Sequence, residues 1–94
     1  MDLPIQHHPI SNRFEIQIDD AFAYLEYLDA GRTLVLTHTF VPPPLRGQGL
    51  AGRLTRAALD FARKEGKTVD PQCSYAAAFM DQHPEYAGLR QPIP

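Results

Sequence analysis

The chain has 94 residues, with a hydrophobic fraction of 44% and a charged fraction of 21%. This length allows one domain with a thin core, and the composition is ordinary for a globular protein. Nine lysines and arginines against eleven aspartates and glutamates give a formal charge of −2. That balance argues against a general nucleic-acid binder, because such proteins carry a basic face.

The cysteine content and the N-terminal sequence indicate the cellular compartment of the protein. The single cysteine, Cys73, can form neither an intrachain disulfide nor a thiolate zinc cluster. The first ten residues, MDLPIQHHPI, lack the basic and apolar regions of a signal peptide, and no apolar run is long enough to span a membrane. We therefore predict a cytoplasmic protein that contacts neither membrane nor nucleic acid, with its oligomeric state left open.

Residues 1–12 contain two prolines and the adjacent His7 and His8. We predict that this segment is a loose lead-in to the domain. Two histidines without a further ligand at a fixed spacing do not make a metal site, so we predict none.

Three segments between residues 13 and 41 have the patterns of β-strands. Residues 13–19, RFEIQID, alternate between apolar and polar side chains, as a half-buried strand does. Residues 21–28, AFAYLEYL, are apolar on both faces, which is typical of a central strand, and residues 32–41, RTLVLTHTFV, are rich in β-branched side chains. Because short turns separate the three segments, we predict an antiparallel meander.

A triple proline at residues 42–44 ends the third strand, because proline lacks the backbone donor that a ladder needs. Apolar residues then recur at helical spacing from Leu50 to Ala62, opposite a side rich in arginine. This pattern predicts an amphipathic helix of about four turns. Gly66 follows as its left-handed C-terminal cap.

The remaining chain predicts one more strand and one more helix. Residues 67–73 indicate a short strand that ends near Cys73, and residues 74–83 indicate a helix with Ser74 as its N-cap, broken by Pro84. The predicted order is β-β-β-α-β-α. It corresponds to an α+β fold in which a three-stranded antiparallel meander is followed by a βαβ crossover and a C-terminal helix.

The stretch LRGQGLAGRL, residues 45–54, contains two different phosphate-binding signatures. One is G-x-G-x-x-G at Gly47, Gly49 and Gly52, and the other is R-x-x-G-x-A, which begins at Arg46. The first would indicate a dinucleotide site, but that site requires the glycines directly after a parallel strand. Here a rigid triple proline intervenes, the preceding strands resemble hairpins, and too little chain follows for a doubly wound sheet.

The start of the predicted helix favours an anion. Residues 45–49 include no Ser, Thr, Asp or Asn, so the first-turn N–H groups lack a side-chain acceptor. The glycines permit close approach, and the helix dipole favours negative charge. A pyrophosphate would satisfy these donors; a loop hydrated by water is the alternative.

VPPPLRGQGLAGRL resembles motif A of the GCN5-related N-acetyltransferases, whose signature is Q/R-x-x-G-x-G/A. Together with the strand HTFV before it, Cys73 after it and HPEY at residues 83–86, it is similar to the small single-domain branch of that family, the N-acetyltransferase domain-containing 1 type. The resemblance covers almost the whole chain. It predicts a domain over residues 13–90 and a C-terminal tail over residues 91–94.

The resemblance implies an acetyl-coenzyme A-dependent N-acetyltransferase. In such a fold the sheet opens between the third strand and the strand that ends near Cys73. The pantetheine arm of coenzyme A would lie in this opening, and the following loop would hold the pyrophosphate through backbone N–H groups. The 3′-phosphate would need a surface cation, either Arg53 or Arg56. The cofactor-binding residues predicted in this way are Phe40, Val41, Arg46, Gly47, Gln48, Gly49, Leu50, Ala51, Gly52 and Arg53.

Three side chains are candidates for the chemistry, of which Cys73 and His38 are the predicted catalytic residues. Cys73 would lie beside the thioester as a nucleophile or as a proton donor to coenzyme A, or it could be a small buried apolar residue. His38 alternates onto the face of Leu36 and Phe40, where it could deprotonate the amine or serve as a hydrogen-bonded core histidine. Tyr75 could be a general acid or a residue of the helix core.

The acceptor amine, a small molecule or a peptide, is not identified by the sequence. His83 and Tyr86 of HPEY could line the acceptor site or dock the last turn. A non-catalytic module that binds coenzyme A or acyl-coenzyme A is the alternative function, and a partner-binding scaffold without a ligand is a third. The small size of the domain favours the non-catalytic module, because it leaves little chain to build an acceptor pocket.

Overall fold

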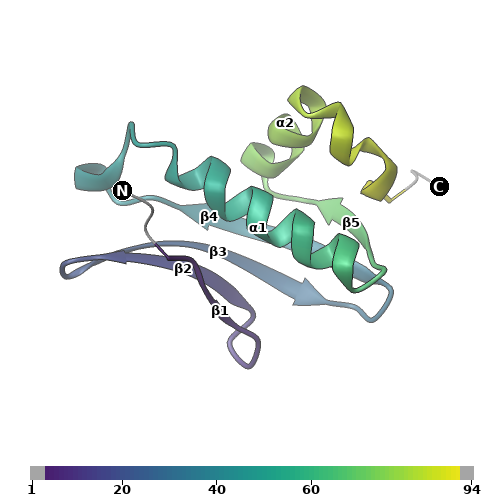
Figure 1. Cartoon of the computed structure of the whole chain (residues 1–94), viewed down its shortest axis with the longest axis horizontal. Coiled ribbons are helices and arrows are strands. Elements are labelled where there is room, and N and C mark those ends of the chain that lie inside the picture. The colour runs from purple at the N-terminus through teal and green to yellow at the C-terminus, as the bar shows by residue number, and fades with distance from the viewer. Residues whose placement is uncertain (1–3, 92–94) are drawn as a thin grey trace.

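The computed structural model describes residues 4–91, which form a five-stranded sheet with two α-helices (Figure 1). The strands are β1 (Gln6–His8), β2 (Arg13–Ile18), β3 (Ala21–Asp29), β4 (Thr33–Phe40) and β5 (Thr68–Pro71). The helices are α1 (Leu50–Lys64) and α2 (Ser74–Gln82), and the 3₁₀ segments are η1 (Pro43–Leu45) and η2 (Pro84–Leu89).

The sheet order follows the chain order, β1-β2-β3-β4-β5. The first four strands form an antiparallel meander, and β5 pairs parallel to β4 after the crossover through α1. This architecture confirms the predicted α+β fold with a meander, a crossover and a C-terminal helix. The structure adds β1 and η1 to the predicted elements.

The expectation of a loose lead-in was wrong for Gln6–His8, which pairs antiparallel with β2. The ring of His7 stacks on Phe14 with ring centroids 4.1 Å apart, and its Nε2 lies 2.6 Å from the hydroxyl of Tyr27. A histidine ring can therefore anchor a strand too short to show a pattern of its own. Residues 1–3 of the expected lead-in lie outside the described residues.

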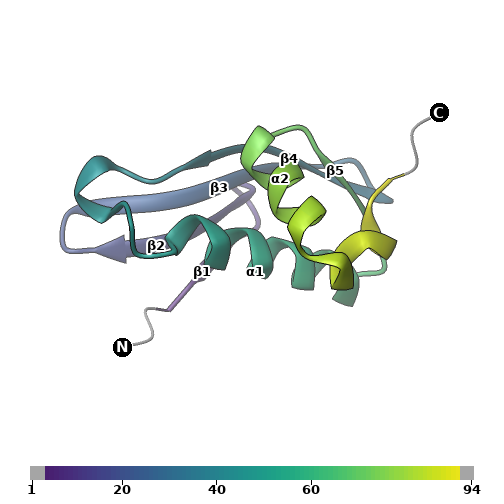
Figure 2. The ribbon, with the colours of Figure 1, turned by 90° about the horizontal axis from the view of Figure 1, so that it is seen from above.

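Helix α1 covers one face of the sheet (Figure 2). On β3 the buried side chains are Ala23, Leu25 and Tyr27, whereas the residues between them are more exposed. The buried side chains of α1 that complete this core are Leu50, Leu54, Thr55, Ala58, Leu59 and Ala62. No helix of residues 4–91 crosses the opposite face of the sheet, and none is long and apolar enough to cross a bilayer.

The ends of the helices agree only in part with the predictions. Helix α1 ends at Lys64, and Gly66 follows with φ +69°, as predicted for a left-handed cap. At α2 the expectation that Ser74 is the N-cap was wrong, because Cys73 holds that position with extended backbone. The N–H of Gln91, expected to fray, donates to the carbonyl of Val69 at 2.8 Å; residues 92–94 of the expected tail lie outside the described residues.

Candidate cofactor site

The site begins where strands β4 and β5 separate. Their pairing ends at the register pair Leu36 and Pro71. The N–H groups of Gln72 and Cys73 then both donate to the carbonyl of Leu36, at 3.0 and 2.9 Å, and the chain turns into α2. Because β4 continues to Phe40, its last residues extend beyond the end of β5, which gives the opening that the family resemblance implied.

The loop between β4 and α1 brings backbone donors to the mouth of this opening. Gly47 and Gly49 have φ values of +82° and +74°, a left-handed conformation that strains any residue with a Cβ. Gly49 is the N-cap of α1, and no side chain caps the helix there. The free N–H groups and the positive end of the helix dipole therefore make this terminus suited to an anion.

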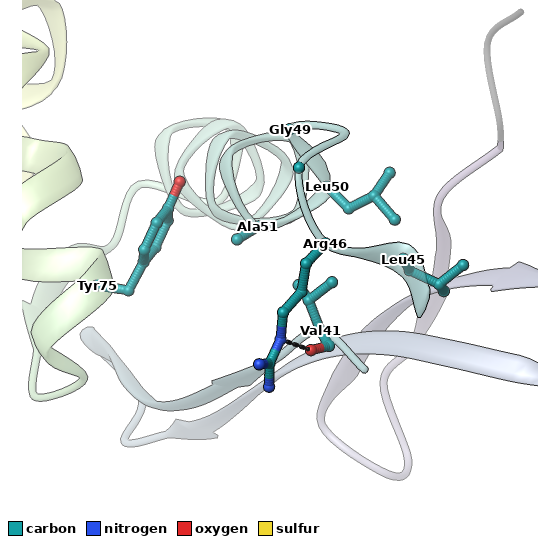
Figure 3. Close-up of a pocket in the computed structure, with 8 residues that line it drawn as sticks. Val41, Leu45, Arg46, Gly49, Leu50, Ala51 and Tyr75 are labelled. Carbon is teal, nitrogen blue, oxygen red and sulfur yellow. Dashed lines mark hydrogen bonds between the residues drawn. The ribbon is translucent and has the colours of Figure 1, made fainter. Parts of the chain in front are cut away.

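A pocket of about 330 Å³ lies between this loop, the end of β4 and α2 (Figure 3). It is lined by Val41, Leu45, Arg46, Gly47, Gly49, Leu50, Ala51 and Tyr75. All of these except Leu45 and Tyr75 are among the cofactor-binding residues predicted from the sequence. Tyr75 had been considered as a general acid or as a residue of the helix core. The sequence did not indicate Leu45 as a pocket residue, because an apolar residue before a loop is equally expected in the core.

The side chain of Arg46 is exposed and turns back towards the strand (Figure 3). Its Nε donates a hydrogen bond to the carbonyl of Val41 at 2.9 Å. Val41 directly follows β4, so this carbonyl lies at the end of the strand edge predicted to pair with pantetheine. Arg46 therefore already donates to the Val41 carbonyl, which a ligand entering the opening would approach.

Not every predicted cofactor residue lines the pocket. The residues outside its lining are Phe40, Gln48, Gly52 and Arg53. Gly52 faces α2, because a Cβ there would meet the hydroxyl of Tyr75 at 3.4 Å and the ring of Phe79 at 3.7 Å, which are ordinary van der Waals distances. It therefore lies beside the pocket residue Tyr75 without lining the pocket itself. The predicted contact of Phe40 uses its backbone and stays a prediction.

Cys73 lies at the closed end of the opening. Its Sγ is 3.5 Å from the hydroxyl oxygen of Thr39 on β4. Burial raises the pKa of the thiol, but hydrogen bonds with the Thr39 hydroxyl and with the backbone of Ala76, Tyr75 and Thr39 together lower it below its ordinary value. The environment thus favours the thiolate, which is the reactive form of cysteine.

His38 does not lie where the sequence placed it. The register pairs His38 with Glu26 and then Leu36 with Tyr27, so β4 carries one extra residue at this point. A bulge of this kind reverses the alternation of side chains. His38 is exposed on the face away from α1, with its ring centroid 5.9 Å from that of Tyr24. The prediction that it shares the face of Leu36 was wrong.

The HPEY segment docks the C-terminal turn onto α1. Tyr86 is only 2% exposed, and its hydroxyl donates to Asp60 at 2.7 Å and accepts from Arg56 at 3.1 Å. The ring of His83 stacks on Phe79, with ring centroids 3.8 Å apart. These contacts favour the docking interpretation over an acceptor site. They also engage Arg56, one of the two cations considered for the 3′-phosphate.

Three comparisons with known proteins agree with this geometry. The family model described as GCN5-related N-acetyl-transferase matches residues 13–89. Protein NATD1 of Bos taurus is 32% identical over 93 residues, covering 94% of this chain and 82% of the relative, and Protein NATD1 of Danio rerio is 32% identical over 90 residues, covering 89% and 81%.

A solved structure has the same architecture. A GCN5-like protein from Staphylococcus aureus, determined in solution by NMR, aligns with a TM-score of 0.77 and 25% identity, over 98% of this chain and 91% of the other. The family match over most of the chain and the shared fold lead to one assignment. The chain belongs to the GCN5-related N-acetyltransferase family.

Proposed function

We propose that the chain is an acetyl-coenzyme A-dependent N-acetyltransferase that acts on an amine. One observation carries this proposal: the uncapped N-terminus of α1, reached through Gly47 and Gly49, borders a pocket beside the opening between β4 and β5. An anionic group at the helix and an extended arm in the opening match the pyrophosphate and the pantetheine arm of coenzyme A. Family membership supports this choice over NAD.

The cofactor would be held mainly by backbone groups. The N–H groups from Gly47 to Gly52 would bind the pyrophosphate, and the free edge of β4 at Phe40 and Val41 would pair with the amides of pantetheine as a further strand does. Because Arg46 donates to the Val41 carbonyl, its guanidinium would have to release this oxygen to a pantetheine amide. It could then turn towards the phosphates.

The transfer itself requires one bond to form and one to break. The nitrogen of the neutral amine would attack the thioester carbon, and the C–S bond would break to release coenzyme A as a thiolate. The proton that the attacking nitrogen loses on becoming an amide balances the proton that the thiolate takes up. His38 is proposed to accept the proton of the ammonium group, directly or through water, because imidazole exchanges protons near neutral pH. Cys73 is proposed as the group next to the thioester, either as a nucleophile that carries the acetyl group or as the proton donor to the thiolate.

One observation favours a second candidate, a coenzyme A-binding module without turnover. The bulge places His38 on the face away from α1, whereas the thiol of Cys73 contacts Thr39. The two proposed catalytic groups therefore approach the opening from different faces and do not contact each other. Productive chemistry would require the acceptor amine to enter from the side of His38.

Calorimetric titration with acetyl-coenzyme A and with NAD tests the cofactor. We expect heat of binding with acetyl-coenzyme A alone; binding of NAD alone, or of neither, would contradict the proposal. Release of free coenzyme A, followed across a panel of amines, then separates enzyme from binding module. Binding of acetyl-coenzyme A without turnover for any amine of the panel would favour the second candidate.

Replacement of the thiol tests the chemistry. Cys73→Ala should leave acetyl-coenzyme A affinity nearly intact, because Cys73 does not line the pocket, and should reduce turnover. A variant that turns over at the full rate would remove the cysteine from the mechanism. The cytoplasmic location and the domain boundaries at residues 13–90 stay predictions.

A further inference from the structure

Arg46 lies between the end of β4 and the first turn of α1. On the side of the strand, its Nε donates to the carbonyl of Val41 at 2.9 Å. On the side of the helix, Arg46 is followed by Gly47 and then by Gly49, the uncapped N-cap of α1. One exposed guanidinium therefore lies between a carbonyl that a pantetheine amide would use and a loop suited to an anion.

The short chain between Val41 and Arg46 holds this arrangement in place. Residues 42–44 are all proline, which fixes φ at each position. The N–H groups of Leu45 and Arg46 donate to the carbonyls of the first and second of these prolines, at 2.9 and 3.3 Å. Leu45 is buried, with 6% of its surface exposed. Because the backbone is fixed here, a change of partner by Arg46 requires only rotation of its side chain.

The guanidinium also takes space that a ligand would need. Arg46 lines the pocket together with Val41, Leu50, Tyr75 and other residues that carry no charge. Figure 3 shows its guanidinium at the end of the strand, pointing away from Gly49. A carbonyl oxygen can accept two hydrogen bonds, so the position and charge of the guanidinium matter as much as the bond itself. An uncharged arm that enters here meets a cation that it cannot neutralise.

Resting on the proposed function, we propose that Arg46 selects thioesters whose pantetheine arm carries a diphosphate over those whose arm carries no phosphate. Arg46 holds the Val41 carbonyl until a diphosphate at the start of α1 engages its guanidinium. A guanidinium binds phosphate oxygens through two parallel charge-assisted hydrogen bonds, which together are stronger than its one bond to a neutral carbonyl. The side chain then leaves β4, and the carbonyl becomes available to the pantetheine amide.

This role couples the two parts of the site. Because coupling between two ligands is reciprocal, pyrophosphate should raise the affinity for pantetheine, and pantetheine should raise the affinity for pyrophosphate by the same factor. An arginine that only attracts phosphate would give a different result. Its removal would weaken pyrophosphate binding and leave pantetheine binding unchanged. Arg46 acts here as a specificity-determining residue and takes no part in the acetyl transfer.

The first test is an NMR titration of the full chain with pantetheine alone. Arg46→Met should bind pantetheine about fivefold more tightly than the wild type, which corresponds to about 1 kcal/mol. Arg46→Ala should show a similar gain, which separates release of the carbonyl from an apolar contact of the methionine. Arg32→Met removes the same charge at an exposed position between β3 and β4 and should bind as the wild type does. Unchanged or weaker binding in Arg46→Met, or a gain confined to it, would overturn the inference.

The second test measures the coupling with inorganic pyrophosphate. Saturating pyrophosphate should lower the Kd of the wild type for pantetheine by about fivefold and leave that of Arg46→Met unchanged. In the wild type labelled with ¹³C, pyrophosphate should also move the resonance of the Val41 carbonyl, because the hydrogen bond from Arg46 is lost. Pyrophosphate that shifts the amides of residues 47–52 but leaves this carbonyl and the pantetheine Kd unchanged would overturn the inference.

The two proposals fail in different ways. Absence of heat with acetyl-coenzyme A would overturn the proposed function and, with it, the selective role of Arg46. Binding of acetyl-coenzyme A to the wild type, together with equal pantetheine affinities in the wild type and Arg46→Met, would overturn this inference alone.

Discussion

Replacement of Gly49 by glutamate probes the cofactor site most directly. Gly49 is the N-cap of α1 and lines the pocket, with φ +74°. A Cβ at this position would meet no atom within 4 Å, so the protein can accommodate the new side chain without a steric clash. The carboxylate would occupy the place of the proposed pyrophosphate and bring like charge to it.

The expected loss of acetyl-coenzyme A affinity follows from the repulsion between the new carboxylate and the pyrophosphate. Two like charges about 5 Å apart repel by about 3 kcal/mol at an effective dielectric of about 20. Solvent screening at an exposed loop reduces this value, so we expect acetyl-coenzyme A affinity to fall by at least about tenfold. The left-handed backbone adds about 1–2 kcal/mol of strain, which destabilises the fold whether or not ligand is present.

Gly31→Glu is the matched control. Gly31 also has a left-handed backbone, with φ +86° and no atom within 4 Å of an added Cβ, but it lies in the turn between β3 and β4, away from the pocket. Both variants should lower the melting temperature to a similar extent, as thermal unfolding will show. Calorimetry should show a loss of affinity in Gly49→Glu alone. Equal affinities in the two variants would refute the placement of the pyrophosphate.

Three further predictions concern the thiol, the first strand and the core. Thr39→Val removes the hydroxyl that contacts Cys73, so alkylation of the thiol by iodoacetamide should shift to higher pH; an unchanged pH profile would contradict the stated cause of its lowered pKa. Burial and the neighbouring His8 lower the pKa of His7 below 6.5, so the unfolded chain binds a proton more readily than the folded one. Stability measured by urea unfolding should therefore fall as the pH drops below about 6.5, and His7→Phe should remove this component. Leu59→Ala empties a fully buried position and should cost about 3 kcal/mol in the free energy of unfolding; a loss below about 1 kcal/mol would contradict the packing described for α1.

Local patterns in the sequence were sufficient for most of the fold. Strict alternation over residues 13–19 and helical spacing from Leu50 to Ala62 correctly predicted β2 and α1. Gly66 correctly predicted the end of α1, because a left-handed cap depends on one residue and its immediate neighbours. The absence of Ser, Thr, Asp and Asn from residues 45–49 indicated an uncapped helix start, which the structure has. These features are properties of short segments, so the residues within each segment determine them.

The remaining features of the fold and of the site depend on contacts between segments that are distant in the sequence. The bulge in β4 depends on its pairing with β3, and it turned His38 to the face of the sheet away from α1. The docking of His7 depends on rings that come from two later elements, Phe14 and Phe61. Tyr75 joined the pocket because α2 packs beside α1, which brings the Tyr75 hydroxyl close to Gly52. Periodicity describes one segment at a time, whereas register and packing are set by the energy of the assembled sheet and helices. The sequence by itself therefore determined most of the elements and the glycine-rich loop before α1, and only the tertiary structure decided which side chains meet at the site.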